Sequence, residues 1–134
     1  MKQRESIAHH LNTVLDENGQ LPCEAAHSVA RQLGIGPGIV GEVADVTEVR
    51  ISRCQLGLFG HAPKKGMDGF KTVIKLANVP ADIADELSRA APSGEISCAE
   101  LWRMAREKAL DRSEMGNIAE TLGLRVRPCQ LGCF

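Results

Sequence analysis

The chain carries one sequence pattern twice, and the two copies lie 75 positions apart. When residues 16–59 are aligned with residues 91–134 without a gap, twelve positions are identical. The identities include the string CQLG followed by any residue and Phe, which chance alone rarely produces. A repeat of this size indicates one supersecondary unit used twice. In the first copy the identical residues are Gly19, Cys23, Ala30, Arg31, Gly41, Ala44, Arg50, Cys54, Gln55, Leu56, Gly57 and Phe59.

Hydrophobic periodicity predicts the same order of elements in each copy. Apolar residues at helical spacing predict an opening helix in the first copy, and Asn18-Gly19 is expected to stop it. Alternating apolar and basic residues predict a short strand at the end of each copy. The expected class is therefore mainly α with short β-strands. The predicted helices are 4–16, 23–34 and 37–46 in the first copy and 80–91, 98–109 and 112–122 in the second, with strands at 49–53 and 124–128.

The middle two helices of each copy have the spacing of a helix-turn-helix pair. A small residue occupies the first helix, another follows four residues later at the turn, and an apolar residue follows six further on. Both copies keep this register, with Ala30, Gly34, Val40 and Val43 in the first and Ala105, Ala109, Met115 and Ile118 in the second. The pattern resembles the helix-turn-helix superfamily.

Three helices followed by a strand also resemble the winged-helix branch of that superfamily, in two tandem modules at 1–76 and 77–134. The resemblance implies a short strand at 19–22 and a β-hairpin with arms at 49–53 and 70–76. The loop LGLFGHAPKKGMDG would form the wing tip. The second copy has no returning arm after its strand, so it is expected to pack on the first copy or on a partner chain.

The charge is unevenly distributed although the net charge is only −1. Residues 50–75 hold six basic side chains and one acidic side chain, a balance of +5, whereas the rest holds ten basic and sixteen acidic, a balance of −6. A basic wing is expected where a winged helix contacts the phosphates of DNA. The alternative interpretation of this basic segment is a mobile loop that increases solubility. The predicted nucleic-acid contacts in this region are Arg50, Arg53, Lys64, Lys65 and Lys71.

The third helices, which would enter a groove, are poor in base-reading residues. The first, PGIVGEVADVTE, has no Lys or Arg. In the second, Arg112, Ser113 and Asn117 are the predicted groove contacts. This composition weakens the DNA hypothesis and favours protein contacts.

The five cysteines are weak candidates for a metal or thiol site. Cys23 and Cys98 each open a second helix, where the helix dipole can lower a thiol pKa, although a small apolar core residue is the favoured interpretation. Cys54 and Cys129 begin the CQLG strings, and the winged-helix resemblance places each near the helix-opening cysteine of its copy. Cys129 and Cys133 form a CxxxC pair, which is a poor metal motif on its own. No metal or other cofactor is predicted.

The remaining sequence features favour a binding protein over an enzyme. No set of acid, base and nucleophile is apparent, and no segment reads as a signal peptide or membrane span, so a cytoplasmic protein without membrane association is expected. The leading hypothesis is a DNA-binding or transcription-regulatory accessory protein that contacts double-stranded DNA. The alternative is a protein-interaction scaffold that binds a protein partner or a second copy, and a thiol or metal sensor is third.

Overall fold

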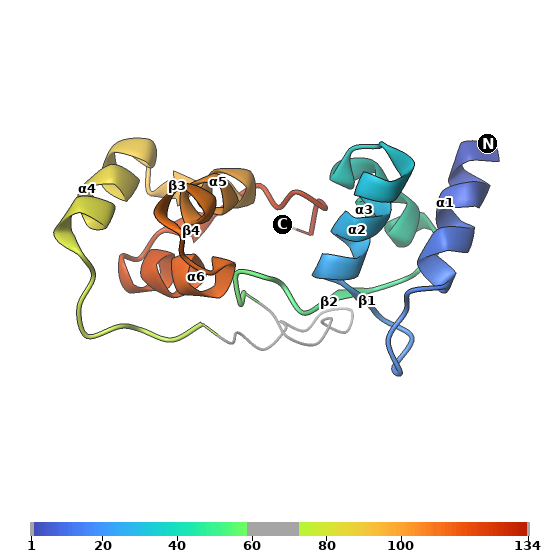
Figure 1. Cartoon of the computed structure of the whole chain (residues 1–134), viewed down its shortest axis with the longest axis horizontal. Coiled ribbons are helices and arrows are strands. Elements are labelled where there is room, and N and C mark those ends of the chain that lie inside the picture. Colours follow the sequence, from blue (N-terminus) through green and yellow to red (C-terminus); the bar gives the residue numbers. More distant parts are fainter. Residues whose placement is uncertain (1, 59–72, 134) are drawn as a thin grey trace.

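The structure is a computed structural model that describes residues 2–58 and 73–133, and it places the two copies of the repeat beside each other (Figure 1). The class predicted from sequence is confirmed, because the described residues are mainly helical with a few short strands. None of the helices in these ranges is long and apolar enough to cross a membrane. The first copy contains α1 (Lys2–Asn12), β1 (Leu21–Pro22), α2 (Cys23–Leu33), α3 (Pro37–Val46) and β2 (Ile51–Ser52), and the second contains α4 (Ala81–Ala90), β3 (Glu95–Ile96), α5 (Cys98–Lys108), α6 (Arg112–Thr121) and β4 (Arg125–Val126).

The predicted pair of helices joined by a short turn forms in both copies. Gly34 and Ala109 end α2 and α5 in the left-handed conformation, with φ of 65° and 55°. This reversal lets the next residue donate back into the helix, and Leu110 N–H bonds to the Ala105 carbonyl at 2.9 Å. The apolar residues predicted to pack at the crossing of the two helices are buried: Ala30, Val40, Val43, Ala105, Met115 and Ile118.

The first helix is shorter than predicted. It ends at Asn12, and the Thr13 hydroxyl donates to the His10 carbonyl at 2.7 Å. The Asp16 carboxylate then accepts the backbone N–H groups of Asn18 and Gln20, each at 2.9 Å. These side-chain bonds offer the backbone an alternative to further helical turns. Gly19 therefore shapes the turn to β1 and does not end the helix.

The short strands pair in parallel within each copy, β1 with β2 and β3 with β4. The predicted hairpin arm at 70–76 is wrong over residues 73–76, which form no strand and do not pair with β2. Their backbone is bonded to α6 instead: Ile74 N–H donates to Asn117 Oδ1 at 2.9 Å and Leu76 N–H to Thr121 Oγ1 at 2.8 Å. The rest of the predicted arm and the wing tip over 59–72 lie outside the described residues.

The two copies exchange their CQLG turns. Leu56, from the first copy, is fully buried in the core of the second copy, among residues of α4, α5 and α6. Leu131, from the second copy, is 4% exposed and completes the core formed by α1, α2 and α3. Each core is therefore incomplete without a turn from the other copy, and in Figure 1 the C-terminal segment lies between the two halves.

A glycine in each third helix makes this exchange possible. A Cβ added at Gly41 would lie 1.8 Å from the carbonyl oxygen of Leu131, and one added at Gly116 would lie 1.8 Å from that of Leu56. The backbone of each turn thus rests directly on the backbone of the opposite helix, where no side chain fits. The identical contacts show that the two copies are related by an approximate two-fold axis.

Candidate functional site

Aromatic and basic side chains stack at the junction of the two copies. His27 of α2 and Trp102 of α5 occupy equivalent positions of the repeat, and their ring centroids are 4.3 Å apart at 45°. The guanidinium carbon of Arg112 lies 3.6 Å from the centroid of the Trp102 ring, close enough for a cation–π interaction. Arg112 also donates a hydrogen bond to Gln55 Oε1 of the exchanged turn.

Burial at this junction keeps His27 neutral. The ring is 6% exposed, and burial, assisted by the positive charge of Arg112, lowers the pKa of His27 to about 4. Three buried nitrogen atoms here have no hydrogen-bond partner among the described residues: His27 Nε2, Trp102 Nε1 and Gln55 Nε2. The junction therefore combines a ring stack with polar atoms that find no hydrogen-bond partner in residues 2–58 and 73–133.

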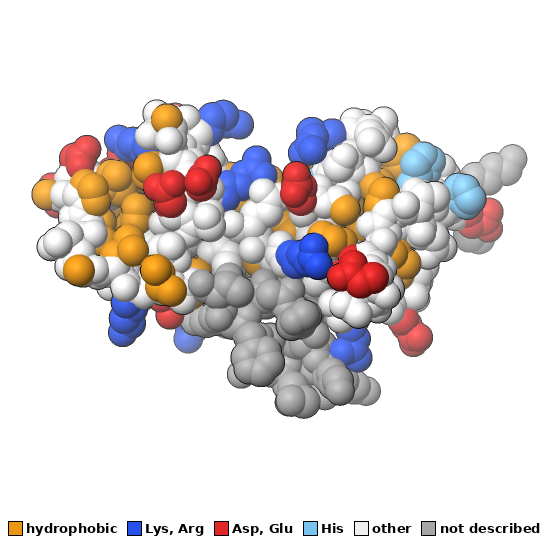
Figure 2. Space-filling model, turned by 60° about the horizontal axis from the view of Figure 1, so that its bottom comes forward, with side chains coloured by type: hydrophobic (Ala, Val, Ile, Leu, Met, Phe, Trp, Pro, Cys, Tyr) orange, Lys and Arg blue, Asp and Glu red, His pale blue; other side chains and the backbone are white. Residues whose placement is uncertain are grey.

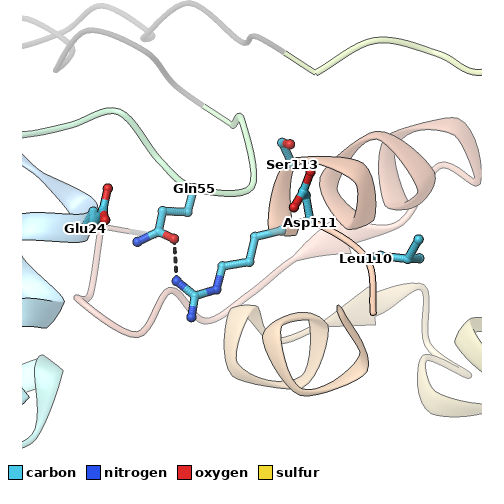
Figure 3. Close-up of a pocket in the computed structure, with 6 residues that line it drawn as sticks. Glu24, Gln55, Leu110, Asp111 and Ser113 are labelled. Atoms are coloured by element: carbon cyan, nitrogen blue, oxygen red, sulfur yellow. Dashed lines mark hydrogen bonds between the residues drawn. The ribbon is translucent and has the colours of Figure 1, made fainter. Parts of the chain in front are cut away.

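An open pocket of about 400 Å³ lies beside the stack (Figure 3). Glu24 of α2 and Gln55 of the exchanged turn form one side, and residues around the start of α6 form the other. Figure 3 shows Gln55 bonded to the side chain that reaches it from α6. The mixed charge gives no single ligand preference. The α6 side is lined by Leu110, Asp111, Arg112 and Ser113.

The cysteines gather near the same junction, where Cys23 is close enough to Cys54, Cys98 and Cys129 for their charges to interact. Cys23 and Cys98 are buried, and burial raises their pKa values to about 12 and about 11. The lowered pKa considered from the helix dipole is therefore wrong for both, because desolvation of the thiolate is the larger effect. Within residues 2–58 and 73–133, no three His, Cys, Asp or Glu side chains are arranged to hold a metal ion.

Cys129 differs from the other buried thiols. A hydrogen bond from the Cys133 thiol, with further bonds from the backbone N–H groups of residues 131–133, lowers the pKa of Cys129 despite partial burial. Leu131 N–H lies 3.4 Å from the Cys129 sulfur. The neighbouring Cys129 thiol, together with burial, raises the pKa of Cys133.

The predicted nucleic-acid contacts that the structure describes have different surroundings. Arg50 and Arg53 are exposed, and Arg53 pairs with Glu17 at 3.6 Å. Arg112 is engaged in the stack, and Asn117 holds the backbone of Ile74. On the face drawn in Figure 2, basic and acidic side chains are interspersed. Ser113 is exposed at the pocket, and Lys64, Lys65 and Lys71 lie outside the described residues.

The third helix of the first copy carries exposed apolar side chains. Ile39 is 42% exposed and Val46 is 65% exposed. They are seven residues apart and lie on one face of α3, with Glu42 between them. Most other large apolar side chains of the described residues are buried or half-buried, so this face is a candidate contact surface.

Sequence reasoning missed His27, Trp102 and Gln55 as partners in one cluster. Their side-chain types suggested no chemistry, and the exchange of turns that brings them together leaves no periodic signal. The equivalence of positions 27 and 102 within the repeat was available, because equivalent residues meet wherever a two-fold axis passes between them.

Comparison with family models, with curated proteins and with solved structures gave no match to this chain. Its relation to the helix-turn-helix superfamily accordingly remains a resemblance in the register and geometry of two helix pairs.

Proposed function

We propose that the chain is a regulatory protein-interaction module that binds a partner protein on the exposed face of α3. The observation that carries the proposal is the apolar pair on that face, Ile39 and Val46, with 42% and 65% of their surface exposed. Burial of two such side chains by a partner supplies about 2 to 4 kcal/mol of favourable free energy before the costs of association. A helix face of this kind suits an amphipathic helix of a partner.

The charge around this face indicates the character of the partner. Residues 37–48 include Glu42, Asp45 and Glu48 and no Lys or Arg. Glu42 is partly neutralised by Arg4 of α1, whose guanidinium lies 2.8 Å away. The partner segment is therefore expected to present apolar residues flanked by Lys or Arg, because complementary charge favours encounter and fixes the register.

The same features weigh against insertion of either third helix into a DNA groove. An acidic α3 would be repelled by phosphates. On α6, Asn117 and Thr121 already hold the segment 73–76, and Arg112 is stacked on Trp102. Base reading by α6 would require these internal contacts to break.

A site-specific crosslinking experiment tests the proposal in cells that produce the protein. A photoreactive residue at position 46 is compared with one at position 74, because Ile74 is equally exposed, at 60%, but lies over the second copy. We expect a single protein to crosslink at position 46 alone, through a segment rich in Lys or Arg and apolar residues. Identical products at both positions, or none at position 46, would refute the proposal.

Titration of the identified partner then measures the contribution of the face. Val46→Asp is expected to weaken binding at least tenfold, which corresponds to about 1.4 kcal/mol, because it buries an unpaired charge in the contact. Ile74→Asp is the matched control and is expected to change the dissociation constant less than twofold. Equal losses in the two variants would contradict binding through α3.

Binding of duplex DNA is the second candidate, and one observation favours it. Arg50 and Arg125 are identical positions of the repeat, both exposed, and residues 50–75 carry a balance of +5. Basic residues in two-fold arrangement suit a duplex. A mobility-shift titration at low salt would select this function if the chain retarded duplex DNA and Lys64→Glu with Lys65→Glu abolished the shift.

A further inference from the structure

The third helices of the two copies, α3 and α6, occupy identical positions of the repeat. Their bounds, Pro37–Val46 and Arg112–Thr121, coincide when the copies are aligned at the spacing of 75 residues. Both helices bury the same four positions: Val40 and Met115, Gly41 and Gly116, Val43 and Ile118, and Ala44 and Ala119. Equivalent positions therefore lie on equivalent faces of the two helices, so their outward faces are directly comparable.

The outward face of α6 holds the backbone of another segment of the chain. Ile74 N–H donates to Asn117 Oδ1 at 2.9 Å. Leu76 N–H donates to Thr121 Oγ1 at 2.8 Å. Figure 1 shows the chain that leads to α4 running beside α6 without forming a helix or a strand.

The spacing of these two bonds suits an extended chain. Asn117 and Thr121 are four residues apart, which is about 6 Å along a helix. Two residues of an extended chain, such as Ile74 to Leu76, span roughly 6 to 7 Å. A helix presents side-chain acceptors every four residues at the interval at which an extended chain presents alternate N–H groups. The face of α6 thus recognises extended backbone.

The equivalent face of α3 is uncovered and retains one of the two acceptors. Glu42 stands at the position of Asn117, and Val46 stands at that of Thr121. Both residues of α3 are exposed, whereas Asn117 and Thr121 are half-buried. One oxygen of Glu42 pairs with Arg4 at 2.8 Å, and a carboxylate has a second oxygen that accepts further bonds.

We propose that α3 binds an extended segment of the partner protein, which donates a backbone N–H to Glu42 and packs an apolar residue on Val46. The inference rests on the proposed function, because it requires a partner on α3. Although such a face also suits a helix, the N–H groups inside a helix are bonded within that helix and are not available to Glu42.

The segment on α6 also indicates the composition of the partner segment. Its sequence over residues 71–76, KTVIKL, places Lys71 and Lys75 around the apolar residues. Residues 37–48 of α3 and its end carry three acidic side chains and no Lys or Arg. Attraction between these charges favours a partner segment of the same kind, with apolar residues between lysines.

The test titrates the isotope-labelled full-length chain with a capped peptide of residues 70–79, FKTVIKLANV, followed by nuclear magnetic resonance. We expect the amide signals of residues 39–46 to shift and the transferred Overhauser effects of the peptide to be those of an extended chain. N-methylation at Ile74 removes the donor to Glu42 and is expected to weaken binding about tenfold. N-methylation at Lys75, between the two donors, is the matched control and should change the dissociation constant less than about threefold.

Two variants of the chain examine the acceptor. Glu42→Ala is expected to weaken binding of the peptide about tenfold, because it removes the acceptor. Asp45→Ala removes the same charge from another exposed position of α3 and should weaken it only about twofold. Circular dichroism confirms that both variants are folded.

Several results would overturn the inference: a helical bound peptide, equal effects of the two N-methyl groups, equal losses in the two variants, or signal shifts confined to α6. If a partner crosslinks at position 46, any of these results removes the extended segment and leaves the proposed function standing. Absence of a crosslink at position 46 overturns both.

Discussion

The two copies of the repeat share a scaffold but differ in what covers their third helices. On α3, Ile39 and Val46 remain exposed, whereas α6 is covered by the segment 73–76 through Asn117 and Thr121. Their CQLG turns differ as well, since Leu58 of the first copy corresponds to Cys133 of the second. The duplication therefore preserves the packing of the repeat while the surfaces of its copies differ.

The largest expected effect comes from the glycines at the exchanged turns. Gly41→Ala and Gly116→Ala are each expected to lower the free energy of unfolding by about 3 kcal/mol or more, because the new Cβ meets a backbone carbonyl that cannot move away freely. Equal losses in the two variants would support the approximate two-fold relation, and urea denaturation measures both.

Gly38→Ala provides the control on the same helix. Its Cβ would lie 3.8 Å from the Gln130 carbonyl oxygen, an ordinary contact, so helix propensity predicts a gain of up to about 1 kcal/mol. A Gly41→Ala variant as stable as Gly38→Ala would show that the turn does not rest on α3.

The stacked ring of His27 predicts a pH dependence that its counterpart Trp102 cannot have. The unfolded imidazole takes up a proton near its ordinary pKa of 6.5, whereas the folded one stays neutral down to about pH 4. Stability is therefore complete above pH 6.5 and is lost as the pH falls to 4, by up to about 3 kcal/mol.

Chemical denaturation of the parent chain and of His27→Gln at pH 7 and pH 4 measures this contribution. The parent chain should lose more free energy of unfolding between the two pH values than the variant does. His9→Gln, a change on the exposed face of α1, is the control and should leave the pH profile unchanged. Parallel profiles for the parent and His27→Gln would exclude a buried neutral ring.

A smaller change in stability is expected at the C-terminal ends of α2 and α5, where the two copies use different residues, Gly34 and Ala109. Gly34 and Ala109 are equivalent, and both are left-handed, which costs Ala about 1 kcal/mol relative to Gly. Ala109→Gly is therefore expected to stabilise the chain and Gly34→Ala to destabilise it by a similar amount, measured by thermal unfolding. Changes of the same sign in both variants would contradict the equivalence.

Local structure was largely predictable from the sequence, because apolar spacing and turn residues act over a few positions. The helix α3 begins and ends at the predicted residues, and α2, α5 and α6 differ by one residue at the end. The winged-helix resemblance implied a strand at 70–76, but over 73–76 side chains of α6 bind the backbone instead. Periodicity reports which side chains tend to be buried and does not report where backbone donors find their acceptors.

The candidate site was much less predictable. The spacing of the repeat indicated that Leu56 and Leu131 are equivalent, yet it could not show that each is buried in the opposite copy. The sequence feature that came closest to indicating this exchange is the glycine shared by the two third helices, Gly41 and Gly116. Glycine inside a helix is unfavourable, and it is useful there where another backbone approaches closely.

The exchanged turns set an unusual order of events during synthesis. Domains commonly fold as units from the N-terminal end as the chain emerges from the ribosome. Leu56, which belongs to the core of the second copy, is synthesised before that copy. The core of the second copy can therefore form as soon as its own helices have emerged. The first copy must wait for Leu131, although its three helices are finished by residue 46. We therefore expect its core to stay incomplete until then, so that Leu131 of a neighbouring chain could fill the same place and join two chains in an intertwined dimer.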